Sequence, residues 1–145
     1  MNNNFKIIQK NQKKYIFDSI RKKYVILTPE EWVRQKTIHY LVNSKNYPPN
    51  LIRIEQKLKG KEQFFRSDIV VYDRNGKAKM IVECKAEKVK ITQDTFEQIS
   101  KYNMQFEVDY LMVTNGIQHF VCKIDYLNKT YTFLPEVPDY LDVKN

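Results

Sequence analysis

The chain has 145 residues, of which 42% are hydrophobic and 29% are charged, with only three glycines and five prolines. This composition excludes a disordered chain, and the length suits a single domain, residues 1–145, with one hydrophobic core. The formal net charge of +8 favours an anionic partner, and nucleic acid is the commonest such partner.

The sequence also excludes several classes of function. No apolar run approaches the roughly 20 residues that a membrane-spanning helix needs, and the polar start of the chain lacks the apolar segment of a signal peptide. There is no GxxxxGK(S/T) stretch, so no nucleotide cofactor is expected. Cys84 and Cys122 lack metal-ligand spacing, which predicts small apolar filler in a reduced, cytoplasmic protein.

The first 27 residues give the weakest signals. Residues 1–14 are polar and basic and are predicted to form a loose N-terminal arm. Residues 15–27 fit a short amphipathic turn followed by an extended apolar run. Three consecutive basic residues there, Arg21, Lys22 and Lys23, are candidates for contacts with phosphates, although a solvated loop accounts for them equally well.

A helix is predicted over residues 29–43. Thr28 is its N-cap, Pro29 takes the first helical position, and Glu31 completes a capping box. Pro48 bars its continuation.

Glu31 also stands at the head of one stripe of this helix, because Gln35, Ile38 and Val42 follow it at helical spacing. Arg34 lies three residues further on, where it can pair with Glu31 or with a phosphate. The pattern leaves open whether Glu31 only caps the helix or faces a functional site.

Three strands should follow as an antiparallel meander. Residues 51–58 alternate apolar and polar side chains, as a half-buried strand does. Two runs rich in Ile and Val, residues 65–73 and 79–86, then flank Asn75 and Gly76. Asn-Gly between two such runs predicts a tight hairpin with a two-residue loop.

That loop sets a register in which carboxylates oppose each other. The predicted cross-strand pairs are Tyr72 with Lys79, Asp68 with Glu83, and Arg66 with Lys85. Opposed like charges destabilise a sheet, so a chain that keeps them is expected to bind a cation there. Two carboxylates at this spacing suit Mg²⁺, and Lys85 points to the same face, where it can reach a phosphate. A solvated strand face is the alternative interpretation.

The pattern Asp68…Glu83-Cys84-Lys85 resembles the D…(D/E)xK signature of the PD-(D/E)XK nuclease superfamily. The resemblance implies that Asp68, Glu83 and the backbone carbonyl of Cys84 hold Mg²⁺ or Mn²⁺, and that Lys85 acts on the attacking water or the transition state. Members of similar pattern often carry a glutamate on the first helix, which makes Glu31 a candidate further ligand.

A second helix is predicted over residues 92–103, with Thr92 as its N-cap. Gln98 and Tyr102 lie one turn apart on it and resemble the QxxxY motif of the recombination-nuclease and phage-exonuclease branch of that superfamily. The resemblance implies that Gln98 positions water or Lys85 and that Tyr102 supports the helix against the sheet. A surface glutamine beside a core tyrosine is the alternative.

Further strands are predicted over residues 109–114, 117–124 and 131–133, followed by a loosely packed tail. The order of elements matches the αβββαβ core of restriction-endonuclease-like folds, an α/β (α+β) class in which helices flank a mixed sheet.

Longer stretches, among them YIFDSIRKKYV, TPEEWVRQ, IVECKA and QDTFEQISKYN, resemble the N-terminal nuclease domain of type I restriction enzyme R subunits. The resemblance covers roughly residues 15–140, in a short free-standing form without a translocase. It implies a metal-dependent deoxyribonuclease of restriction or DNA defence, with Arg66, Arg34 and the basic triplet as DNA contacts. A catalytically silent nucleic-acid-binding module, a homodimer and a subunit of a larger complex stay open.

Overall fold

The structure, a computed structural model, describes residues 5–59 and 64–145, without the side chains of residues 56–59, 64–67 and 102. Its larger sheet has six strands in the order β4-β5-β6-β7-β8-β9. These strands are β4 (Ile52–Lys59), β5 (Phe64–Tyr72), β6 (Ala78–Cys84), β7 (Tyr110–Thr114), β8 (His119–Asp125) and β9 (Thr130–Phe133). β6 and β7 are parallel and the other neighbours antiparallel, so the predicted mixed sheet is confirmed.

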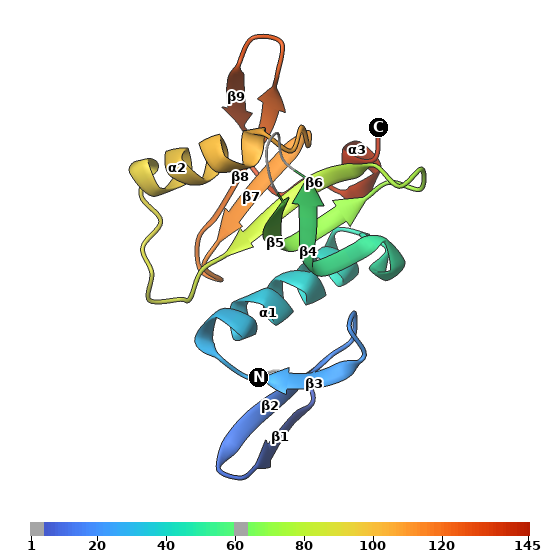
Figure 1. Cartoon of the computed structure of the whole chain (residues 1–145), viewed down its shortest axis with the longest axis vertical. Helices are drawn as coiled ribbons and strands as arrows, with labels where there is room; N and C mark the ends of the chain where they lie inside the picture. The colour runs from blue at the N-terminus through green and yellow to red at the C-terminus, as the bar shows by residue number, and fades with distance from the viewer. Residues whose placement is uncertain (1–4, 60–63) are drawn as a thin grey trace.

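Helices cover both faces of this sheet (Figure 1). α1 (Pro29–Ser44) and the short α3 (Tyr140–Val143) share one hydrophobic cluster with alternate strand residues such as Ile69 and Val71. α2 (Gln93–Met104) packs on the other face, where Phe96 joins Val70 and Ile81. The alternation of buried side chains along β5 thus supplies both halves of the core.

The succession α1, β4, β5, β6, α2 and β7 is the predicted αβββαβ core, so the fold is restriction-endonuclease-like. Both helix starts are also as predicted, because Thr28 Oγ1 accepts the N–H of Glu31 at 3.0 Å and Thr92 Oγ1 accepts that of Thr95 at 3.1 Å. None of the helices in the described ranges has the length and apolar character to cross a bilayer.

Both ends of the chain are more ordered than the sequence predicts. The loose arm expected over residues 1–14 is wrong for the described part, which forms β1 (Ile7–Lys10) and the start of β2 (Lys13–Asp18). The tail is not loose either, because Val137 and Tyr140 are buried against the main core.

β1, β2 and β3 (Lys23–Ile26) form a separate three-stranded sheet, called the small sheet below. It lies on the side of α1 away from the large sheet (Figure 1). The β1–β2 loop consists of Asn11 and Gln12, both with positive φ, as in a type I′ turn. Glycine normally takes the second of these positions, so Gln12 concealed the hairpin from sequence reasoning.

The hairpin between β5 and β6 is not the predicted two-residue turn. Gly76 N–H donates to the Asp73 carbonyl at 3.1 Å, and Asp73 N–H donates to the Lys77 carbonyl at 2.8 Å. Of the loop residues, Gly76 has a positive φ of +84° and Asn75 does not. The loop is therefore a three-residue turn, residues 74–76, that ends in a left-handed glycine.

A bulge compensates for this longer loop. Tyr72 pairs with Ala78 instead of the predicted Lys79, and the register shifts between Val71 and Tyr72. From there on Val71 pairs with Met80. The predicted register is therefore wrong at the turn and right from Val71 towards Asp68, because the extra residue of the loop is cancelled by Lys79 in the bulge.

Two glycines with nearly equal backbone strain allow a matched test of the fold. Gly76 (φ +84°) has open space where a Cβ would lie, whereas a Cβ on Gly116 (φ +89°) would lie 3.3 Å from Lys36 Nζ and 3.4 Å from Val33 Cγ2. We expect Gly76→Ala to lower the free energy of unfolding by about 1–2 kcal/mol, and Gly116→Ala to lower it further because of crowding. Urea denaturation measures both, and equal losses would contradict the close approach of Gly116 to α1.

Candidate active site

Two carboxylates meet where β5 and β6 run side by side. Ile69 pairs with Val82, so Asp68 and Glu83 are the next residues across the same pair of strands. Asp68 Oδ2 accepts the backbone N–H of Cys84 at 2.8 Å, which fixes this carboxylate against β6. Glu83 Oε1 is buried and has no hydrogen-bond partner in the described structure. An unpartnered buried carboxylate oxygen is costly, and a bound cation would relieve that cost.

The environment of Glu83 disfavours its negative charge. The pKa of Glu83 is raised from 4.5 to about 8, chiefly by burial and in addition by the negative charge of Asp68 and a hydrogen bond between the two carboxyls. The positive charge of Lys85 acts in the opposite direction and lowers the pKa of Glu83. The register places Asp68 and Glu83 opposite each other, and the roles of these two residues and of Lys85 stay predictions.

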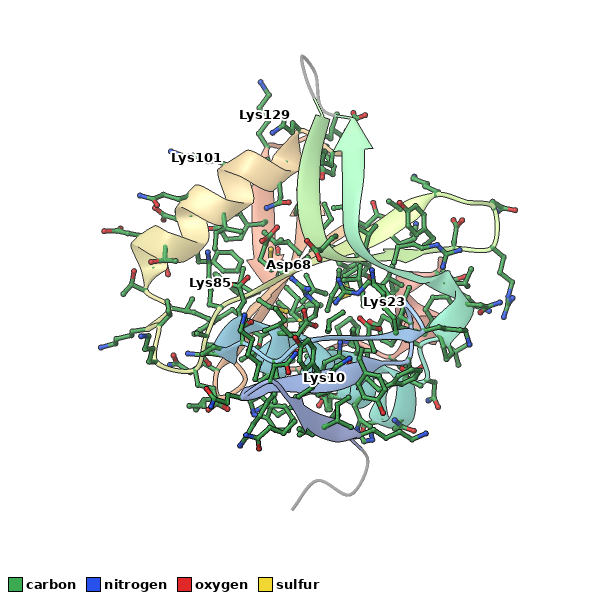
Figure 2. The ribbon with its side chains drawn as sticks, turned by 60° about the horizontal axis from the view of Figure 1, so that its bottom comes forward. Lys10, Lys23, Asp68, Lys85, Lys101 and Lys129 are labelled. Atoms are coloured by element: carbon green, nitrogen blue, oxygen red, sulfur yellow. The ribbon has the colours of Figure 1, made fainter. Side chains whose placement is uncertain are left out.

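Lys85 follows the end of β6. Its backbone N–H donates to the carbonyl of Thr114 at 2.8 Å, which ties it to the end of the parallel strand β7. Its side chain is half-buried, and Figure 2 labels it beside Asp68.

Arg34 of α1 also contacts Asp68. Its Nη2 donates to Asp68 Oδ1 at 3.1 Å and its Nη1 to Glu31 Oε1 at 2.8 Å. Arg34 is buried, with 6% of its surface exposed, and its Nε has no hydrogen-bond partner in the described structure. The predicted pairing with Glu31 is therefore present, and the same guanidinium also anchors Asp68.

Arg21 extends this ion-pair network to the small sheet. Its guanidinium contacts Asp18 at 2.6 Å, Glu55 at 2.7 Å and Glu31 at 3.1 Å. Glu31 thus accepts from Arg21, from Arg34 and, at 2.9 Å, from the amide of Gln35. The structure places Glu31 in this network, and its role as a metal ligand stays a prediction.

The network leaves an excess of negative charge. Its members are two arginines and four carboxylates, namely Arg21, Arg34, Asp18, Glu31, Glu55 and Asp68. Glu83 adds a fifth acidic group beside Asp68. Because two guanidinium groups cannot neutralise this set, a cation at Asp68 and Glu83 is electrostatically favoured.

Sequence reasoning missed the roles of Asp18 and Glu55. In the register of β4 and β5, Glu55 lies opposite Asp68. It falls between the pair of Ile54 with Ile69 and the pair of Gln56 with Ser67. Its φ of +51° is unusual inside a strand, and strained backbone of this kind clusters at functional sites. The only local signal for Glu55 was a charged residue within a strand that alternates apolar and polar side chains.

The remaining predicted residues form no hydrogen bond or ion pair with the two carboxylates in the described structure or lie outside the description. Lys22 and Lys23 are exposed on the small sheet and its turn. Gln98 is exposed on α2, and its role stays a prediction. The side chains of Arg66 and Tyr102 lie outside the described part of the chain, so the roles of these residues stay predictions.

The oxygen atoms at this site fit a hard divalent cation that is held by few protein ligands and several waters. Within the described residues, no group of three or more His, Cys, Asp or Glu side chains is arranged to hold a metal. Asp68, Glu83 and the carbonyl of Cys84 would supply oxygen ligands only, and water would complete the coordination, which is the pattern typical of Mg²⁺.

Comparison with known proteins agrees with this fold. The family described as type I restriction enzyme R protein N terminus (HSDR_N) matches residues 29–138. The chain belongs to this family. A search of curated proteins found no match.

Two solved structures are similar to this member of the HSDR_N family. One is a fragment described as an HsdR subunit of a type I restriction enzyme from Vibrio vulnificus YJ016, with a TM-score of 0.55 and 19% identity. That match covers 81% of this chain but 24% of the other, so the chain spans about a quarter of its length and the likeness shows the fold alone. The other, described as a nuclease of the DUF820 group from Anabaena variabilis, has a TM-score of 0.47 and 10% identity over 89% of this chain and 80% of its own, too slight a likeness to support an argument.

The raised pKa of Glu83 predicts a pH-dependent loss of stability in the absence of metal. The folded protein keeps a proton on Glu83 between pH 4.5 and about 8, whereas the unfolded chain releases it, so stability falls as the pH rises through this range. In EDTA, Glu83→Gln should melt at a higher temperature than the wild type at about pH 9, and the two melting temperatures should converge at about pH 5. Glu136→Gln, which removes an exposed carboxylate, is the control, and equal pH profiles for wild type and Glu83→Gln would contradict the prediction.

Removal of Arg34 should be far more damaging than removal of a surface cation on the same helix. Arg34→Met leaves buried carboxylates without their partner, for which we expect a loss of about 3–5 kcal/mol in the free energy of unfolding. Lys36→Met breaks an ion pair to Glu87, in which both side chains are partly exposed, and a cation–π contact with Trp32, and should cost about 1 kcal/mol. Denaturant unfolding of both variants tests this, and a small loss for Arg34→Met would show that the network contributes little to the fold.

Proposed function

We propose that this protein hydrolyses phosphodiester bonds of DNA with the help of Mg²⁺ or Mn²⁺. Membership in the HSDR_N family supports a nuclease-like role in restriction. The observation that carries the metal dependence is the buried, unpartnered Oε1 of Glu83 beside Asp68. When bound, such an ion supplies a Lewis acid that activates water and neutralises charge on the phosphate.

Each residue of the site then has a separate task. Asp68 and Glu83, with the carbonyl of Cys84, hold the ion, and the N–H of Cys84 keeps Asp68 in place. Lys85 orients the attacking water or stabilises the charge that develops on the phosphoryl oxygens, as a fixed cation can do in a water-poor site.

Arg34 is proposed to contact a phosphate of the substrate. Its guanidinium is a planar group of five donors that matches phosphate geometry, and its Nε has no partner in the described structure. A shift of Arg34 from Asp68 to the phosphate would free a carboxylate oxygen for the ion. Glu31 and Glu55 keep the guanidinium in reach of both positions.

The bond between Arg34 and Asp68 also favours a second candidate, a catalytically silent module that binds nucleic acid. In that case the guanidinium occupies the carboxylate permanently in place of a metal. Membership in the HSDR_N family further favours action within a larger restriction complex in the cytoplasm, which we include in the proposal. The preference between endonuclease and exonuclease cleavage is left to experiment.

Replacement of Lys85 separates an enzyme from a binding module. An interaction felt only in the transition state changes the rate and leaves affinity nearly unchanged. Lys85→Ala should therefore reduce Mn²⁺-dependent cleavage of plasmid and linear DNA by on the order of 10²–10³-fold, while DNA affinity falls by no more than one phosphate contact. Lys88→Ala, an equal charge change at an exposed position of the same segment, should retain activity. Absence of metal-dependent cleavage by the wild type, with only affinity altered in Lys85→Ala, would favour the silent module.

A further inference from the structure

The small sheet has an inner face that is buried along β2 and a second face that is open; at the edge of the sheet Ile7, across from the buried Ile16, is also 45% exposed. Along β2 the buried residues alternate with half-buried ones, so Ile16 and Asp18 point inward and Tyr15 and Phe17 outward. The register places further residues on the open face, called the outer face below: Ile8, Lys10, Lys13, Tyr24 and Ile26. This face includes three large apolar side chains that are 40–50% exposed, namely Ile8, Tyr24 and Ile26.

The charge around this face has one sign. Residues 5–27 carry six lysines, all exposed, which are Lys6, Lys10, Lys13, Lys14, Lys22 and Lys23. Asp18 is the single acidic residue of this stretch, and it is fully buried and paired with Arg21. By register Lys10 and Lys13 lie on the outer face, whereas Lys14 and Lys23 alternate onto the inner face. The outer face therefore meets solvent with positive charge and no counterbalancing carboxylate of its own stretch.

Aromatic rings lie between these lysines. Phe17 and Tyr24 are cross-strand neighbours whose rings meet edge to face, with centroids 5.2 Å apart. Lys6 Nζ lies over the Phe17 ring, 5.7 Å from its centroid. A platform of exposed aromatic rings among basic side chains is how single-stranded nucleic acids are bound, because unpaired bases stack on the rings while phosphates meet the cations.

The small sheet is tied to the candidate active site through its inner face. Arg21, in the turn between β2 and β3, contacts Asp18, Glu31 and Glu55, and Arg34 links Glu31 to Asp68. Because Asp18 alternates with Phe17 along β2, the outer face is directed away from this network.

We propose that the outer face binds a single-stranded segment of nucleic acid. The proposal rests on the proposed function for its choice of partner. A protein partner fits less well, since lysine is depleted in protein–protein interfaces. A duplex fits less well too, because its bases are stacked inside and would leave Tyr24, Ile8 and Ile26 without a matching surface.

Binding in EDTA tests the proposal without cleavage. The full chain is titrated into a fluorescein-labelled oligo(dT) and into a labelled duplex of the same length, and affinity is followed by fluorescence anisotropy over a range of NaCl concentrations. Tyr24→Leu should weaken binding of the single strand by about tenfold, as loss of one stacked base does, and should weaken the duplex much less. Tyr24→Phe keeps the ring and should keep the affinity.

The lysines provide a second, independent readout. The slope of log K against log salt is negative, and Lys10→Ala and Lys13→Ala should each make it shallower by about 0.7 for the single strand. Lys129→Ala makes the same charge change on the far side of the molecule (Figure 2), and Phe133→Ala removes a ring that is 42% exposed, close to the 40% of Tyr24. Both controls should bind as the wild type does.

Several outcomes would overturn the proposal. Unchanged single-strand affinity in Tyr24→Leu is one, and equal weakening of single strand and duplex, which would indicate a plain phosphate-binding patch, is another. Sedimentation that shows a dimer dependent on Tyr24 and no binding of oligo(dT) would assign the face to a second copy of the chain. If the wild type cleaves nothing but binds oligo(dT) through Tyr24, the proposed hydrolysis fails and this inference stands.

Discussion

The guanidinium of Arg34 joins the two halves of the site, because it bonds Glu31 on its own helix and Asp68 on β5. Burial of the Arg34 guanidinium is costly unless carboxylates pair with it. Burial of these carboxylates is costly in turn unless the guanidinium pairs with them. This mutual requirement adds to the apolar packing of α1 on the large sheet, and it links Asp68 to Arg21 of the small sheet through Glu31. A substitution in any one member therefore affects the others.

The same site supports the proposal of a bound divalent cation. Arg34 satisfies one oxygen of Asp68 and the N–H of Cys84 the other, whereas Glu83 Oε1 is buried without a partner. The least favourable environment for a negative charge is that of Glu83, whose pKa is raised by burial and by Asp68. Membership in the family supports a nuclease-like role. The buried, unpartnered oxygen of Glu83 beside Asp68 supports the proposed metal.

The small sheet changes the picture of the N-terminal 27 residues. It lies ahead of the residues that match the family, yet its Arg21 is bonded into the ion-pair network and its lysines surround an open aromatic face. The inner side of this sheet thus supports the site, and its outer side presents a basic surface. The basic triplet that sequence reasoning treated as a unit is divided between these tasks, because Arg21 turns inward and Lys22 and Lys23 stay exposed.

The sequence by itself determined what depends on neighbours in the chain: the capped starts of α1 and α2, the alternation of β5 and β6, and the opposition of Asp68 and Glu83. That opposition came out right although the turn was predicted wrongly, because a bulge at Lys79 cancels the longer loop. Only the tertiary structure decided the contacts of Arg34 with Asp68 and of Arg21 with Glu55, each between residues 34 apart in the chain. Such pairings are set by how α1 and the small sheet pack, and no local pattern encodes them.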